Sequence, residues 1–136
     1  MEKTSLTKEI KGTHYQQYKV QPIELIMDMG WNFIQGNIAK YVLRAKYKNG
    51  QEDIDKAIHY CELGMDLDDR ESYADNIAFQ RITNFIQNNE LNPFITSILL
   101  HIEAKSYKKA RELLLEKDIV RDYFLKIDEK ILSVQN

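Results

Sequence analysis

Residues 32–61 read NFIQGNIAKYVLRAKYKNGQEDIDKAIHYC and carry the clearest fold signal in the chain. Apolar side chains recur every three or four residues on both sides of Asn49-Gly50, which is the spacing of a buried helical face. The apolar positions are Ile34, Ile38, Tyr41, Val42 and Ala45, then Ile54, Ala57, Ile58, Cys61 and Met65. We therefore predict two helices, over 32–47 and from 51 to the 66–69 region, separated by a glycine turn.

The same periodicity continues on both sides of this stretch. Pro22 suits the first turn of a short helix that ends at Gly30. Its expected inward residues are Ile23, Ile26 and Met27. Further helices are predicted over 71–88, 93–104 and 106–115, with a last one from Asp118. The inward residues of that last helix are Val120, Phe124, Ile127 and Ile131.

No segment alternates with period two for long enough to require a strand, so the predicted fold is all-α, with six or seven helices. We expect three parts along the chain. Residues 1–13 form a flexible N-terminal arm, and residues 14–70 form the helical core. Residues 71–136 form a helical extension that serves as a cap or for oligomerisation.

The composition argues for a cytosolic protein without a long polyanionic partner. The chain has 136 residues, a formal net charge of −2 and one cysteine, which cannot form an intrachain disulfide. No apolar run approaches the ~20 residues that span a bilayer. We therefore expect no DNA, RNA or membrane partner.

Charge is nevertheless distributed unevenly. Between Asp28 and Glu52 there is no acid, but Lys40, Arg44, Lys46 and Lys48 give this window a net charge of +4. On a helix, Asn37, Lys40, Arg44 and Lys48 share one polar stripe. Amide and cationic donors suit a phosphate or a nucleotide, whereas the alternative is an ordinary solvated helix face.

Two further features favour a small ligand. Gly36 lies inside a predicted helix, where glycine costs about 1 kcal/mol relative to alanine, so a ligand or another backbone is expected to approach closely there. Aromatic rings, on which bases can stack, precede or join the basic stripe. They are His14, Tyr15, Tyr18, Trp31, Phe33 and Tyr41, of which Trp31 and Phe33 fit core packing equally well.

The next predicted helix adds a second polar stripe. It contains Asp53, Lys56 and Tyr60 at positions i, i+3 and i+7. Asp53 either accepts a hydrogen bond from a base or sugar edge, or pairs only with Lys56 or Arg44.

The combined pattern resembles the SaV-like family of small tailed-phage proteins, which includes a phage nucleotide kinase. The similarity covers roughly residues 14–67. It lies in His14-Tyr15, Pro22-Ile23-Glu24, Asn32-Phe33-x-x-Gly36-Asn37-x-x-Lys40-Tyr41-x-x-Arg44-Ala45 and Lys48-x-Gly50-x-x-Asp53-x-x-Lys56-Ala57-x-x-Tyr60.

This resemblance implies a phage nucleotide-binding protein that acts in the cytoplasm of an infected bacterial cell. Its expected activity is sequestration of cyclic nucleotide immune signals, such as cyclic GMP-AMP, without turnover. A symmetric homo-oligomer would supply each cation and ring twice. The expected ligand-binding residues are His14, Tyr15, Tyr18, Trp31, Phe33, Gly36, Asn37, Lys40, Tyr41, Arg44, Lys48, Asp53 and Lys56.

Neither a cofactor nor a resident metal is expected for sequestration. The main alternative is a nucleoside monophosphate kinase, which would require ATP and magnesium, although the chain lacks the usual glycine-rich phosphate loops. A hydrolase is weakly suggested by Glu52-x-x-Asp55 alone, and a protein-interaction module is the other alternative. Cys61 is expected to be a core residue, and His59 and His101 lack zinc-ligand spacing.

Overall fold

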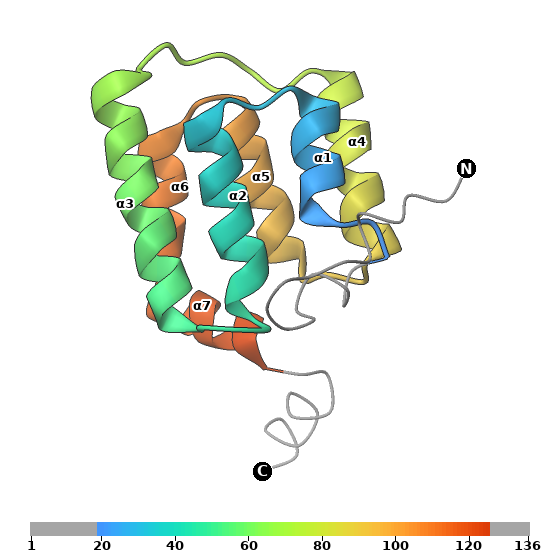
Figure 1. The fold of residues 1–136 in the computed structure, drawn as a ribbon, viewed down its shortest axis with the longest axis vertical. Helices are drawn as coiled ribbons and strands as arrows, with labels where there is room; N and C mark the ends of the chain where they lie inside the picture. The colour runs from blue at the N-terminus through green and yellow to red at the C-terminus, as the bar shows by residue number, and fades with distance from the viewer. Residues whose placement is uncertain (1–18, 126–136) are drawn as a thin grey trace.

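The computed structural model describes residues 19–125, and within this range every regular element is a helix (Figure 1). This confirms the predicted all-α class. The helices are α1 (Pro22–Met29), α2 (Phe33–Ala45), α3 (Gln51–Leu67), α4 (Asn76–Asn88), α5 (Pro93–Glu103), α6 (Tyr107–Leu114) and α7 (Lys117–Phe124). The predicted arm, His14, Tyr15 and Tyr18 lie outside the described residues, as do Ile127 and Ile131.

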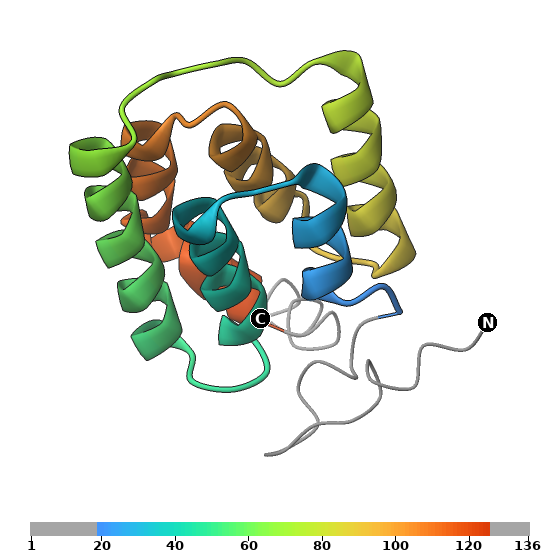
Figure 2. The same ribbon diagram turned by 45° about the horizontal axis from the view of Figure 1, so that its top comes forward.

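Six helices form two layers of three, and α7 crosses one end of them (Figures 1 and 2). One layer contains α3, α2 and α1, and the other contains α6, α5 and α4. Contacts between the layers join α3 to α6, α2 to α5 and α1 to α4. Within the described range, no helix is both long and apolar enough to cross a membrane.

A single hydrophobic core lies between these layers and draws on both the predicted core and the predicted extension. Ile38 and Leu43 of α2 and Ile54 of α3 belong to the same buried cluster as Ile98 and Ile102 of α5. A buried hydrogen bond reinforces the contact, because the Gln35 side-chain amide donates to the Ile102 carbonyl at 2.8 Å. The two predicted parts are therefore continuous in packing.

The helix boundaries follow local capping chemistry. Asn32 accepts from the Gln35 backbone N–H at 2.9 Å, and the Gln35 side chain accepts from the Asn32 N–H, so the two form a capping box. Gly30 ends α1 in the left-handed region at a φ of 65°. Asp75 caps α4, and this explains why α4 begins at Asn76 rather than at the predicted residue 71.

The predicted inward face of α1 was wrong at two positions. Ile23 and Met27 are 54% and 74% exposed, whereas Leu25 is buried and Ile26 is partly buried. The reason is that α1 packs against both α2 and α4, so its contact surface is centred on Leu25 and Ile26.

Met65 was also predicted to be buried but is 39% exposed. At this level of α3 the inward positions are Cys61 and Gly64, and Gly64 lies directly against the ring of Tyr107. This contact directs the opposite side of α3, including Met65, toward solvent.

Candidate functional site

The basic stripe of α2 and the polar stripe of α3 come together on the outer side of one layer. We call this surface the basic–aromatic face and define it as Phe33, Lys40, Tyr41 and Arg44 of α2 with Lys56 and Tyr60 of α3. Because α2 and α3 pack closely along their length, residues separated by the Asn49-Gly50 turn become neighbours.

Three aromatic rings of this face lie in succession. The Tyr41 and Tyr60 rings are stacked, with centroids 5.9 Å apart and planes inclined by 21°. The Phe33 ring meets Tyr60 edge-on at 6.0 Å. Phe33 is 75% exposed, so its side chain is accessible to a planar ligand.

Three cationic side chains surround the Tyr41 ring. The Lys40 Nζ, Arg44 Cζ and Lys56 Nζ atoms lie 4.5, 5.0 and 5.4 Å from its centroid. Attraction between each cation and the π-electrons contributes to holding this arrangement. Arg44 and Lys56 are each paired with an acid, so the positive charge that remains available to attract an anion here is that of Lys40.

Asp53 lies buried beneath the basic–aromatic face and pairs with Arg44. Its Oδ2 and Oδ1 accept from Arg44 Nε at 3.1 Å and from Arg44 Nη2 at 2.8 Å. The Asp53 side chain is fully buried, and that of Arg44 is 14% exposed. Burial acts to raise the pKa of Asp53, but the hydrogen bonds and positive charge of Arg44, together with Asn49, outweigh it and lower this pKa.

The structure thus buries the Asp53 carboxylate behind Arg44, with no exposed surface. Of the alternatives for this residue, the pairing with Arg44 is the one the structure contains. Lys56 lies 3.5 Å from Glu52 in an exposed pair, whereas no acid of the described chain lies within ion-pair distance of Lys40. Lys40 therefore contributes charge that no described protein acid offsets.

Other expected site residues lie elsewhere or have local roles. Trp31 is buried, and its indole N–H donates to Glu103 at 3.4 Å, so it belongs to the core. A Cβ added at Gly36 would lie 3.3 Å from Ile26, which shows that the close approach is made by α1. The Asn37 amide donates to the Phe33 carbonyl, and Lys48 is exposed beyond the end of α2.

Tyr60 was part of the polar stripe in the sequence but was not among the expected ligand-binding residues. The structure places it between Phe33 and Tyr41, at the centre of the aromatic row. Its position one helical turn after Lys56 was the available signal, since residues i and i+4 share a helix face.

Other reactive groups offer little chemistry within the described range. Cys61 is fully buried, and burial raises the pKa of its thiol to about 12, so it is a core residue, as predicted. Among residues 19–125, no group of three or more histidine, cysteine, aspartate or glutamate side chains could hold a metal ion.

Fold and site together define a small helical domain with a positively charged aromatic surface. A family of proteins described as of unknown function, DUF3310, matches residues 10–62, which is 53 of the 136 residues. This stretch contains all six residues of the basic–aromatic face. No match was found among curated proteins or solved structures.

Proposed function

We propose that this protein binds a nucleotide on the basic–aromatic face and sequesters cyclic nucleotide signals of bacterial antiviral defence, such as cyclic GMP-AMP. The observation that carries the proposal is the convergence of Lys40, Arg44 and Lys56 on the Tyr41 ring.

A nucleotide needs two kinds of contact, and this face offers both. Lysine and arginine donate charge-assisted hydrogen bonds to phosphate oxygens. An exposed aromatic ring can stack on a base, typically for about 1–3 kcal/mol. Tyr60 stacks on the Tyr41 ring that the cations surround, and the exposed Phe33 ring meets the far side of this row at Tyr60, so a ligand lying along the row could contact both groups.

The two acids paired with the basic–aromatic face, Asp53 and Glu52, favour binding without phosphoryl transfer. A kinase of ordinary mechanism needs a carboxylate or hydroxyl to hold magnesium beside the transferring phosphoryl group. Asp53 is buried and bound by Arg44, while Glu52 is exposed and pairs with Lys56. Neither carboxylate is arranged to hold magnesium over Tyr41.

A cyclic dinucleotide contains two bases and two phosphates. One basic–aromatic face provides a single cluster of cations and a single row of rings. Two copies related by a twofold axis would provide matching contacts for both halves of the ligand. A symmetric homo-oligomer is therefore part of the proposal.

The direct test is incubation of the purified protein with mono-, di- and cyclic nucleotides, with and without ATP and magnesium. Heat denaturation then releases bound material for chromatography. We expect a cyclic nucleotide to be depleted from solution and recovered intact. An ATP-dependent diphosphate product would instead establish the kinase alternative.

Lys40→Ala tests whether the face is the binding site. We expect about a tenfold or greater loss of affinity, equivalent to ~1.4 kcal/mol, with a nearly unchanged thermal midpoint, because the variant loses the contact with the Tyr41 ring. Alanine preserves the helix, and Lys40 has no described acid partner to lose. Lys108→Ala, at an exposed position of α6, is the matched control. Equal affinity of both variants would place the site elsewhere.

A further inference from the structure

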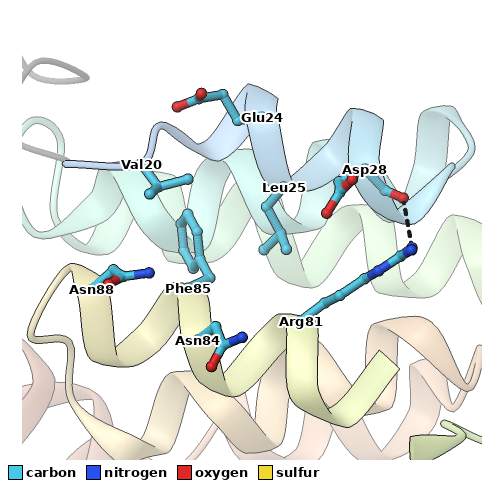
Figure 3. A pocket seen from close by; sticks show the side chains of 8 residues that line it. All are labelled: Val20, Glu24, Leu25, Asp28, Arg81, Asn84, Phe85 and Asn88. Atoms are coloured by element: carbon cyan, nitrogen blue, oxygen red, sulfur yellow. Dashed lines mark hydrogen bonds between the residues drawn. The ribbon is translucent and has the colours of Figure 1, made fainter. Parts of the chain in front are cut away.

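A concave site lies between α1 and α4, on residues that the basic–aromatic face does not use (Figure 3). Its volume is about 340 Å³, which is within the range of small-molecule sites. Val20, which is only partly buried, contributes apolar surface to the lining, and Leu25 of α1 and Phe85 of α4 lie almost fully buried beneath it. The apolar contact that the cavity offers is therefore mainly that of Val20.

Its charged rim has an unusual arrangement. Arg81 Nη1 donates to the backbone carbonyl of Asp28 at 3.1 Å. No ion pair joins the Arg81 guanidinium to the Asp28 carboxylate, although Figure 3 shows the two residues side by side. One cation, Arg81, and two acids thus line the same cavity. The Glu24 carboxylate accepts from the Gln21 backbone N–H, whereas Asp28 and Arg81 do not neutralise each other through an ion pair.

Two polar residues of the rim are not those that helix stability favours. Asp28 occupies the last turn of α1, where the partial negative charge of the helix end disfavours a carboxylate. Asn84 lies inside α4, where asparagine is a poor helix former. Residue types that disfavour the helix in which they lie are expected mainly at functional sites.

We propose that this cavity binds a free α-amino acid with an aliphatic side chain. Arg81 receives the ligand carboxylate, and Asp28 receives its ammonium group. The side-chain amides of Asn84 and Asn88 can donate to or accept from either group. The aliphatic side chain lies against Val20, above Leu25 and Phe85, where its burial is favourable.

The test is a titration of the full-length ¹⁵N-labelled protein with L-leucine, followed by NMR of the Asn84 and Asn88 side-chain amides. We expect saturable shifts at millimolar ligand. Isoamylamine lacks the carboxylate and 4-methylpentanoate lacks the ammonium group, so each should bind at least about tenfold more weakly. Absence of a saturable shift with leucine, or equal binding of either analogue, would overturn the proposal.

Substitutions of the two charged residues that would contact the ligand test whether leucine binds in this cavity. Arg81→Gln and Asp28→Asn should each weaken leucine binding at least about tenfold. Arg121→Gln and Asp118→Asn are matched controls, because these residues form an exposed pair on α7 and should leave binding unchanged. Unchanged binding in Arg81→Gln would also overturn the proposal. Because the two sites share no residue, nucleotide binding and leucine binding can succeed or fail separately.

Discussion

Arg44 and Lys40 occupy the same stripe of α2, but their energetic roles differ. Lys40 extends toward Tyr41 without a described acid partner, whereas Arg44 neutralises the fully buried Asp53. Removing one partner of a buried ion pair leaves an uncompensated charge. Spacing in the sequence correctly predicted that Lys40 and Arg44 share a face, but it could not show which of them supports a buried acid.

Arg44→Ala should therefore destabilise the protein as well as weaken ligand binding. We expect a loss of about 3 kcal/mol at neutral pH, because Asp53 would lose both hydrogen bonds and its counter-charge. Urea unfolding monitored by circular dichroism measures the change, with Lys40→Ala as the control of nearly unchanged stability. Equal stability of the two variants would show that the Arg44–Asp53 pair is energetically unimportant.

The lowered pKa of Asp53 also sets the sign of a pH effect at this residue. A carboxyl whose pKa is lower in the folded state stabilises the fold fully above its ordinary unfolded value. That contribution is lost as the pH falls through the ordinary value toward the lowered one. The Arg44→Ala variant should consequently show a smaller loss of stability on acidification than the wild-type chain.

At the scale of elements, the close contact between α3 and α6 depends on the absence of a side chain at Gly64. A Cβ built on Gly64 would lie 2.6 Å from Cγ of the Tyr107 ring. The Tyr107 hydroxyl is itself held by Asp68 at 2.5 Å, and Asp68 also accepts from Asn32 and Lys105. The ring is therefore fixed at both ends and has little freedom to move away.

Gly64→Ala should destabilise the protein by about 1–3 kcal/mol through overpacking, despite the higher helix propensity of alanine. Gly36→Ala is the matched control. It gains the same propensity inside α2 but meets only the flexible Cγ2 of Ile26, at 3.3 Å. Thermal unfolding of both variants measures the difference, and a Gly64→Ala midpoint at or above that of Gly36→Ala would contradict the packing argument.

At the scale of the whole molecule, the stretch that matches the family contains only some of its packing partners. Helices α2 and α3 bury their apolar faces against α5 and α6. Helix α7 adds a buried hydrogen bond, because the Tyr123 hydroxyl donates to the Val42 carbonyl at 2.7 Å. The basic–aromatic face is consequently supported by helices that contribute none of its residues.

A chain truncated after Leu67 should therefore fail to fold cooperatively. Its remaining helices would expose the core surfaces that α5 and α6 cover, and isolated short helices are marginal in water. Circular dichroism during heating would show low helicity and no sharp transition, in contrast to the full chain. A cooperative transition in the truncated chain would show that the first three described helices form an autonomous unit.

The helical class, the approximate position of each helix in the described range and the cationic stripe of α2 were all predictable from the sequence. These properties are local, because apolar spacing and capping residues act within one or two helical turns. The tertiary structure alone decided that Trp31 is core, that Gly36 accommodates α1, that Asp53 anchors Arg44 and that Tyr60 lies at the centre of the aromatic row. Each of these outcomes depends on which helix packs beside which. Helices pair so that several apolar faces are buried at the same time. The pairing therefore cannot be predicted from the apolar face of one helix alone.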